Sequence, residues 1–324
     1  MNMSPRAVGH SGIEVGPLGL GCWPLSGMTR SGITSVAAVA TVTAALDAGI
    51  MHLDTAYCYG EAGESERAIA QAITGRHRDA VVIASKCGIH WEPGRKQCVD
   101  GRPERIREEV EESLTRLGTD HVDLLYLHAP DPTIPIEASA GALAQLLTEG
   151  KTRAVGVSNV SLAQLERFAA ACPLSACQLH FNMLQREIET EILPWCRSHD
   201  VAMFVYWPLM KGLLAGSMPR DLVFPTTDSR HKYPMFTGEE FQRNLDFVDS
   251  LRPVATRLGC ELTDLVLAWT AEQVGITCVL FGATSPEQVQ INAQALACEL
   301  DDDARRAIAV ATQNRGPVAG RRAV

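Results

Sequence analysis

Four side chains with acid–base chemistry stand where apolar runs of the sequence stop. Asp54 and Tyr59 follow the first of these runs, Lys86 ends the second and His128 ends the third. A phenol and a carboxylate alone make a poor acid–base pair, because they titrate near about 10 and about 4. An ammonium between them could lower the pKa of the phenol while the carboxylate holds it in place. The four residues predict a proton-transfer site around Tyr59.

The rest of the chain alternates strand and helix patterns. Short apolar runs, typical of strands buried on both faces, precede stretches with apolar residues at helical spacing. Several of these stretches begin at a proline or stop at a glycine. The expected strands are 18–21, 49–54, 81–86, 122–128, 153–158, 176–181, 201–206 and 277–281, and the expected helices are 35–48, 65–73, 103–117, 135–149, 162–171, 187–199, 240–258, 262–272, 286–297 and 302–311.

Strands and helices that alternate without a linker favour one domain over residues 1–324, folded as a single α/β (β/α)8 TIM barrel. Extra parts are a short N-terminal hairpin within 1–17, a polar loop at 88–101, additional C-terminal helices and a flexible tail at 314–324. Catalytic groups of such barrels lie at the C-terminal ends of strands, where all four residues above stand. A doubly wound sheet is the main competitor, but the first strand lacks the expected GxGxxG turn.

Composition excludes several functional classes. The 324 residues are 46% hydrophobic and 21% charged, and a net charge of −9 argues against a nucleic-acid partner. The ten cysteines form no CxxC pair, so we expect core thiols in a reducing compartment and no metal site. Without a signal-peptide pattern or eighteen consecutive apolar residues, the sequence predicts a cytoplasmic protein with no membrane partner.

A series of short motifs runs in order along nearly the whole chain. They are Gly19-Leu-Gly-Cys-Trp23, Asp54-Thr-Ala-x-x-Tyr59-Gly60, Ser65-Glu66, Lys86, Ser113-Leu-x-Arg-Leu-Gly-x-Asp120, Asp123-Leu124 with His128, Gly150-Lys151, Gly156-Val-Ser-Asn159, Gln178, Pro208-Leu-x-x-Gly-x-Leu214, and Gly282-Ala283 with Gln288 and Asn292. In this order they closely resemble the motifs of bacterial-type aldo-keto reductases.

The resemblance implies a catalytic tetrad in which Tyr59 is the acid, Lys86 and Asp54 tune it, and His128 positions the carbonyl. It implies NAD(P)H-dependent reduction of an aldehyde or ketone, or oxidation of an alcohol or sugar hemiacetal. Hydride transfer leaves negative charge on the carbonyl oxygen, so a proton donor is needed there. Without the motifs, Asp54 and Lys86 could equally form a structural ion pair, and His128 could be a core residue.

The resemblance also implies a nicotinamide cofactor, with NADP(H) favoured over NAD(H). However, residues 281–299 contain no lysine or arginine to bind a 2′-phosphate, so NAD(H) stays open. Ser285, Pro286 and Gln288 predict an N-cap, a first helical proline and a capping-box partner, a helix start that suits an anion. The implied contacts are Ser158, Asn159 and Gln178 for the carboxamide, Tyr206 for the ring, and the segment Leu209–Gly216, with Gly212, and the turn Gly282–Ser285 for the pyrophosphate, with Pro208 as a further cofactor contact. Gln288 and Asn292 match adenosine-binding positions, and Thr284 stands where an arginine is common in bacterial-type members.

The expected partner is a small-molecule carbonyl compound or sugar. Trp23, Tyr57 and Trp91 are expected to line its pocket, although each could instead serve packing. Two hypotheses from other functional classes remain. A metal-dependent hydrolase barrel would want an HxH motif at the first strand, which residues 18–23 lack. A nucleotide-binding regulatory barrel, like the beta subunits of voltage-gated potassium channels, would show little turnover.

Overall fold

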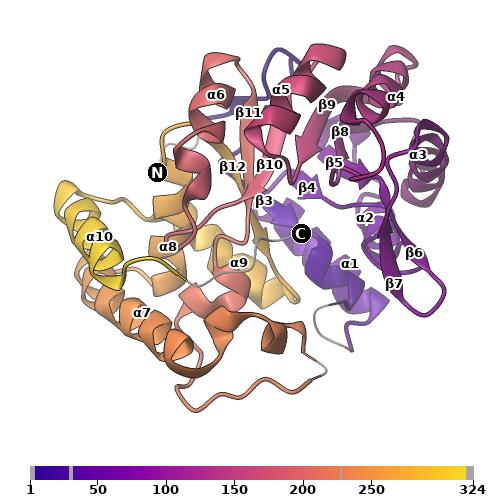
Figure 1. Ribbon diagram of the computed structural model, residues 1–324. Helices are drawn as coiled ribbons and strands as arrows, with labels where there is room; N and C mark the ends of the chain where they lie inside the picture. The colour runs from indigo at the N-terminus through magenta and orange to yellow at the C-terminus, as the bar shows by residue number, and fades with distance from the viewer. Residues whose placement is uncertain (1–3, 29–31, 227, 319–324) are drawn as a thin grey trace.

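The computed structural model describes residues 4–28, 32–226 and 228–318. Its centre is a closed barrel of parallel strands in the order β10-β11-β12-β3-β4-β5-β8-β9 (Figure 1). The predicted TIM barrel is thereby confirmed. The barrel strands are β3 (Leu18–Gly21), β4 (His52–Asp54), β5 (Val82–Cys87), β8 (Val122–Leu127), β9 (Thr152–Ser158), β10 (Ala176–His180), β11 (Ala202–Tyr206) and β12 (Ile276–Gly282).

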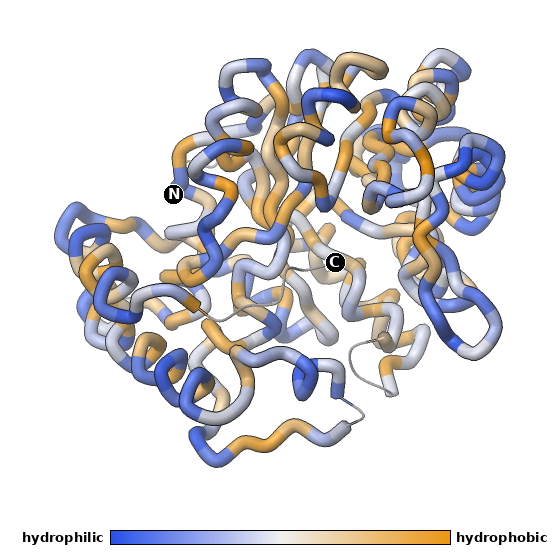
Figure 2. Tube along the Cα trace, viewed as in Figure 1, coloured by the Kyte–Doolittle hydropathy of each residue, from blue (hydrophilic) through white to orange (hydrophobic). Residues whose placement is uncertain are grey.

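Helices surround the barrel, and several of them contact its strands directly. Figure 2 shows the hydrophobic strands at the centre and the hydrophilic residues on the outer helices. Two helices are additional to the repeating unit: α7 and α10, which lie side by side (Figure 1). The helices are α1 (Ser35–Asp47), α2 (Glu64–Ala72), α3 (Pro103–Leu117), α4 (Ile136–Thr148), α5 (Leu162–Ala171), α6 (Ile192–Ser198), α7 (Gly238–Leu258), α8 (Leu262–Glu272), α9 (Pro286–Gln294) and α10 (Asp302–Arg315).

The predicted N-terminal hairpin consists of β1 (Arg6–Ala7) and β2 (Glu14–Val15), paired antiparallel. Its side chains Val8, Ile13 and Val15 are buried in one cluster with residues of the barrel interior. Among these are Ala154, Ala176 and Ala202, which stand near the starts of their strands. The hairpin therefore closes the end of the barrel where the strands begin, and leaves the opposite end for the site.

Two glycines make room for large side chains inside the barrel. A Cβ on Gly156 would lie 2.4 Å from the ring of Tyr126, and a Cβ on Gly19 would lie 2.7 Å from Cδ2 of His52. Real Cβ atoms do not approach other atoms so closely, so larger residues at these positions would displace both rings. Tyr126 and His52 also pack near Phe204, with ring centroids 6.2 and 5.1 Å from it.

Residues 88–101, predicted to be an irregular loop, instead contain a β-hairpin. The strands β6 (Ile89–Glu92) and β7 (Lys96–Val99) pair antiparallel across a turn that contains Gly94 and Arg95. Both of these residues adopt positive φ, at 84° and 62°. The polar composition of this segment masked its strands, because one of the two faces carries charged and polar side chains.

Two helical predictions also need correction. The expected helix 187–199 is broken into a 3-10 turn, Glu187–Glu189, and α6. Pro194 explains the break, since it lacks the N–H that a continuous helix would bond to the carbonyl of Thr190. The tail expected from residue 314 starts later, because α10 continues to Arg315, which is buried and bonds through Nη2 to Asn244 Oδ1 at 2.7 Å. Residues 319–324 of that tail lie outside the described part of the chain.

None of the ten cysteines is joined in a disulfide, and eight of them are buried, as expected of core residues. Within residues 4–28, 32–226 and 228–318, no helix is both long enough and apolar enough to cross a membrane.

Candidate active site

The structure brings Asp54, Lys86 and Tyr59 into direct contact. Asp54 ends β4 and Lys86 stands near the end of the adjacent β5, so neighbouring parallel strands place the two side chains together. Lys86 Nζ lies 2.5 Å from Asp54 Oδ1 and donates to Tyr59 Oη at 3.1 Å and to the carbonyl of Thr55 at 2.9 Å. All three donor sites of the ammonium are therefore used, and its position between acid and phenol is fixed.

The second oxygen of Asp54 is held from across the barrel. Gln178, on β10, donates from Nε2 to Asp54 Oδ2 at 2.7 Å. The carbonyl of Gln178 in turn accepts the hydroxyl of Ser158 at 2.8 Å. Asp54, Gln178 and Ser158 are all buried. Without these hydrogen bonds, their polar atoms would be desolvated and unpaired, which costs free energy of folding.

His128 follows the last residue of β8, and its ring lies 5.7 Å from the ring of Tyr59. Cys58 Sγ lies 3.5 Å from Nδ1 of His128. The backbone of His128 is also fixed, because its carbonyl accepts Nδ2 of Asn159 at 2.9 Å. Asn159, which adopts a positive φ of 58°, accepts the hydroxyl of Tyr206 at 2.7 Å. One amide therefore connects His128 to the end of β11.

Burial sets the protonation states of this site. It raises the pKa of Tyr59 well above its ordinary value, and the carboxylate of Asp54 raises this pKa further. Burial also lowers the pKa of His128 well below its usual range, with a second contribution from the charge of Lys86. This direction is opposite to the shift toward neutrality expected from the nearby ammonium, because burial and the negative charge of Asp54 both disfavour the phenolate.

Of the three aromatic residues expected to line the substrate pocket, Trp23 and Trp91 lie beside Tyr59. The ring of Trp23 stands edge-on to Tyr59 with centroids 5.0 Å apart, and Trp91 Nε1 donates to the carbonyl of Cys58 at 2.9 Å. Tyr57, in contrast, donates its hydroxyl to Glu112 at 2.8 Å, and its ring lies 4.4 Å from the guanidinium of Arg116. Its hydroxyl and ring therefore contact α3, and the placement of Tyr57 in the substrate pocket stays a prediction.

The segment after β11 forms a tight loop with unusual backbone conformations. Trp207, Met210 and Lys211 all adopt positive φ, and the 3-10 segment Met210–Ala215 is kinked at Lys211 and Gly212. Pro208 and Leu209, both expected to contact the cofactor, precede that kink. Such backbone strain in non-glycine residues is typical of ligand-binding loops.

Lys211 lies in this loop, within the segment expected at the pyrophosphate, but the sequence analysis did not single it out. Its Nζ lies 4.3 Å from the ring centroid of Trp207 and 5.0 Å from that of Tyr233. Burial, together with the charge of Arg230, lowers the pKa of Lys211 to about 8. Arg230 also donates from Nη1 to the carbonyl of Lys211 at 3.3 Å. The available signal was a single basic residue inside the otherwise apolar run 208–215.

The residues expected at the adenosine end form a compact cap on α9. Ser285 accepts the N–H of Gln288, as predicted for an N-cap. The side chain of Gln288 accepts the N–H of Thr284 at 2.8 Å rather than that of Ser285, so the expected capping box is shifted by one residue. Asn292 donates to the carbonyl of Gly282 at 3.4 Å, which ties the helix to the end of β12.

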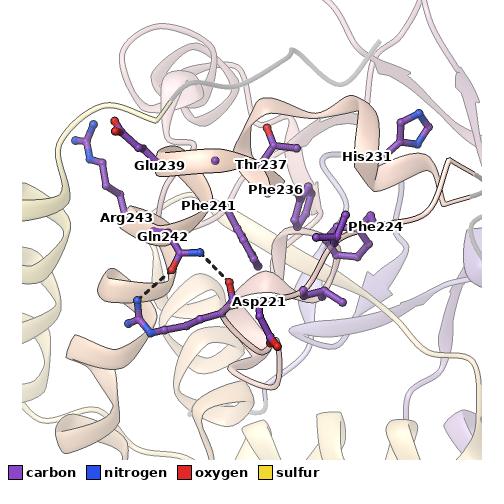
Figure 3. A pocket seen from close by; sticks show the side chains of 13 residues that line it. Asp221, Phe224, His231, Phe236, Thr237, Glu239, Phe241, Gln242 and Arg243 are labelled. Carbon is purple, nitrogen blue, oxygen red and sulfur yellow. Dashed lines mark hydrogen bonds between the residues drawn. The ribbon is translucent and has the colours of Figure 1, made fainter.

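A hollow of about 730 Å³ lies between residues 220–224 and the first turns of α7 (Figure 3). Three phenylalanines line it, together with Arg220, which bonds Gln242 through both its guanidinium and its carbonyl. None of the tetrad residues Asp54, Tyr59, Lys86 and His128 belongs to its lining, so the candidate site is the tetrad and not this hollow.

Comparison with known proteins finds relatives that match nearly the whole chain. The chain is 35% identical over 315 residues to aldo-keto reductase YhdN of Bacillus subtilis, covering 96% of this chain and 94% of the relative. It is 34% identical over 314 residues to the NADH-specific methylglyoxal reductase of Escherichia coli, covering 93% and 95%. The structure of glycerol dehydrogenase AKR11B4 from Gluconobacter oxydans matches with a TM-score of 0.90 and 33% identity, covering 98% and 97%.

The sequence model of the Aldo/keto reductase family also matches this chain, over residues 17–311. It begins just before the first barrel strand and ends within α10, so it includes every barrel strand and all four residues of the tetrad. The chain is an oxidoreductase that belongs to the Aldo/keto reductase family.

Proposed function

We propose that the chain reduces a small aldehyde or ketone, and oxidises the corresponding alcohol in reverse, with Tyr59 as the proton donor and acceptor. The observation that carries this proposal is the shared contact of Lys86 Nζ with Asp54 Oδ1 and Tyr59 Oη, at 2.5 and 3.1 Å. A bound reduced nicotinamide supplies the hydride. The protein supplies the proton, the orientation of the carbonyl and the charge around it.

The proton transfer follows from the contacts around Tyr59. As the carbonyl carbon gains a hydride, the oxygen becomes negative and takes the proton from Tyr59 Oη. Lys86, 3.1 Å away, stabilises the phenolate that remains, and Asp54 keeps that ammonium in place. His128 is neutral at pH 7, so it can hold the carbonyl oxygen as a hydrogen-bond donor without adding a charge.

The residues at the strand ends fit a nicotinamide group. Ser158, Asn159 and Gln178 supply hydroxyl and amide groups directly beside the tetrad, as a carboxamide requires. Tyr206 stands at the end of β11 with its hydroxyl fixed to Asn159, which leaves its ring as a stacking surface. Lys211 would neutralise a pyrophosphate at the kinked loop Leu209–Gly216, which the sequence analysis assigned to that group.

We infer a preference for NADH over NADPH, contrary to the expectation from the resemblance. The segment 281–299 offers no cation to a 2′-phosphate, and Glu287 places an acid in the first turn of α9. Thr284 stands where the resemblance places an arginine. The relative from Escherichia coli, at 34% identity, is described as NADH-specific, which supports the same choice.

The substrate is expected to be small. Trp23 and Trp91 flank Tyr59, and the cluster around it also contains Ile89 and Ala129. The named activities of two relatives, on methylglyoxal and glycerol, concern three-carbon compounds. A panel of methylglyoxal, glyceraldehyde and an aryl aldehyde would rank these classes by kcat/KM with NADH.

The test of the acid–base assignment is Tyr59→Phe. This variant should lose about 10²- to 10⁴-fold in kcat/KM, because general acid catalysis contributes that much. Its affinity for NADH, measured by quenching of tryptophan fluorescence, should stay within a few-fold of the wild type. Full activity of Tyr59→Phe would overturn the assignment. Weak binding of both NADH and NADPH to the wild type would overturn the cofactor site.

A further inference from the structure

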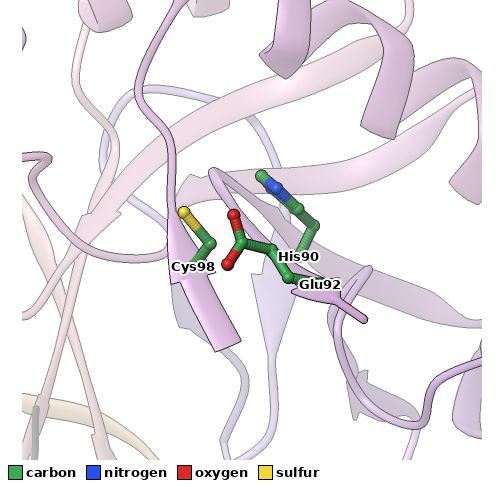
Figure 4. A group of neighbouring side chains, drawn as sticks. All are labelled: His90, Glu92 and Cys98. Atoms are coloured by element: carbon green, nitrogen blue, oxygen red, sulfur yellow. The ribbon is translucent and has the colours of Figure 1, made fainter. Parts of the chain in front are cut away.

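The hairpin β6–β7 places three metal-binding side chains on one face. His90 and Glu92 are two residues apart on β6, so both point to the same side, and the register pairs His90 directly with Cys98 of β7. One ligand atom from each residue lies within 4.8 Å of the others. Figure 4 shows the Glu92 carboxylate between the Cys98 thiol and the His90 ring. The spacing of these residues in the sequence does not indicate a metal site, because Cys98 comes close to His90 only through the pairing of the two strands.

A buried carboxylate stands behind the histidine of this group. His90 Nδ1 lies 3.3 Å from Glu109 Oε1, without the angle of a hydrogen bond. Glu109 is fully buried, and its other oxygen accepts the N–H of Gly88 at 2.6 Å. Coordination of a metal through Nε2 of His90 would leave Nδ1 facing Glu109, the arrangement in which a carboxylate orients a metal-bound imidazole.

The opposite face of the same hairpin forms part of the candidate active site. Trp91, between His90 and Glu92, points the other way and donates from Nε1 to the carbonyl of Cys58 at 2.9 Å. Ile89, Trp91 and Val99 of the hairpin pack with Tyr59 in one apolar cluster. An ion bound on the face of His90 and Glu92 would therefore also restrict the motion of Trp91, which packs beside Tyr59 on the opposite face.

We propose that His90, Glu92 and Cys98 bind a divalent transition metal of the zinc class, and that this ion stiffens the substrate side of the active site. A nitrogen, a sulfur and a carboxylate oxygen suit Zn²⁺, whereas Mg²⁺ and Ca²⁺ require oxygen ligands. Ligand atoms of a tetrahedral zinc site lie roughly 3.3–3.8 Å apart, so small rotamer changes of the exposed Glu92 and half-exposed Cys98 bring the three together. Water fills the fourth position, and the Cys98 thiol releases its proton to solvent on binding.

Binding is tested with the full chain, without a polyhistidine tag, titrated with Co²⁺ and then with Zn²⁺. Co²⁺ should give a thiolate-to-cobalt charge-transfer absorption that saturates at one ion per chain and is abolished by Zn²⁺. Cys98→Ser should remove the absorption, and Glu109→Gln should weaken Zn²⁺ binding about ten-fold, as loss of a carboxylate behind a ligand does. The matched control is Cys260→Ser, because Cys260 Sγ lies 3.3 Å from Cys298 Sγ and offers another thiol site. Loss of the absorption in Cys260→Ser, or its survival in Cys98→Ser, would overturn the proposed site.

The effect on the pocket rests on the proposed function and has its own measurement. Saturating Zn²⁺ should change the aldehyde KM of the wild type at least about two-fold while the Kd for NADH is unchanged, and should not change KM in Cys98→Ser. Equal responses of both proteins would overturn the coupling to the pocket. A protein without any turnover would leave the cobalt measurement intact, so failure of the function and failure of the metal site are distinguishable.

Discussion

The thiol of Cys58 lies 3.5 Å from Nδ1 of His128, one residue away from the phenol of Tyr59. Burial raises the pKa of Cys58 to about 12, so the thiol keeps its proton and can donate it in a hydrogen bond. A neutral histidine carries its proton on only one nitrogen. A thiol that donates to Nδ1 therefore leaves the proton on Nε2, which makes that nitrogen the donor for a carbonyl oxygen.

Removal of this donor should slow catalysis. Cys58→Ala is expected to lower kcat/KM about two- to ten-fold, the effect of one neutral hydrogen bond, because His128 then divides between its two tautomers. Cys58→Ser should restore most of the rate, since a hydroxyl can donate as the thiol does. Cys177→Ala serves as the control for loss of a buried thiol elsewhere in the barrel. Wild-type kinetics in Cys58→Ala would show that Nδ1 needs no donor.

Variants of the buried ion pair Lys86–Asp54 can distinguish its effect on stability from its effect on catalysis. Lys86→Met should lower the free energy of unfolding by about 3–5 kcal/mol, because it leaves an uncompensated carboxylate in the barrel. The double variant Asp54→Asn/Lys86→Met should recover most of that loss in urea denaturation while turnover stays absent. If the double variant unfolds as easily as Lys86→Met, the instability has another source than the unpaired charge.

The direction of the Tyr59 pKa shift predicts opposite pH responses of the two reactions. Reduction needs the protonated phenol, which dominates at every pH below a pKa that burial has raised. Oxidation needs the phenolate, whose fraction rises about ten-fold per pH unit below that pKa. Single-turnover rates should therefore stay level for reduction and climb for oxidation between about pH 6 and pH 9. A reduction rate that falls across this range would contradict a raised pKa.

The sequence predicted the barrel well because its signals are local. Each strand is an apolar run and each helix repeats its apolar residues at helical spacing, so the alternation of elements could be read in order. The tetrad residues follow from the same rule, since the end of a parallel strand fixes the end of the barrel where its side chain lies. The hairpin at 89–99 had one usable signal, the Pro93-Gly94 pair between two short segments.

Features that depend on distant contacts could not be predicted. Gln178 reaches Asp54 across 124 positions of sequence, and no spacing indicates that pairing. Tyr57 precedes Tyr59 by only two residues, yet Glu112 and Arg116 on α3 decide where its ring points. The direction of the Tyr59 pKa shift differs from the expected one for a related reason. The sequence can indicate that an ammonium lies nearby, but the degree of burial depends on the whole fold.

A basic residue at the adenosine end should create affinity for NADPH. Thr284→Arg is expected to tighten NADPH binding about ten-fold or more through a charge-assisted contact with the 2′-phosphate, and to change NADH binding little. Thr284→Gln is the control, since it adds length without charge. Both Kd values can be followed by tryptophan quenching. Tight NADPH binding by the wild type would instead place a cation from another segment at the phosphate.

His52 makes the stability of the barrel sensitive to acid. It lies fully inside the barrel, 5.1 Å from the ring of Phe204, and burial lowers its pKa to about 4. In the unfolded chain the same group titrates near about 6.5. Between these two values the unfolded chain binds a proton that the folded protein does not bind, so stability falls as the pH falls.

The difference of about 2.5 pKa units corresponds to about 3 kcal/mol at most. Urea denaturation of the wild type should show this loss between pH 7 and pH 4, and His52→Leu should remove it. Each protein is compared with itself at pH 7, so any change of packing beside Gly19 cancels. His77→Gln, at an exposed histidine, should keep the wild-type slope. Identical slopes in the wild type and His52→Leu would mean that other buried groups govern the acid response.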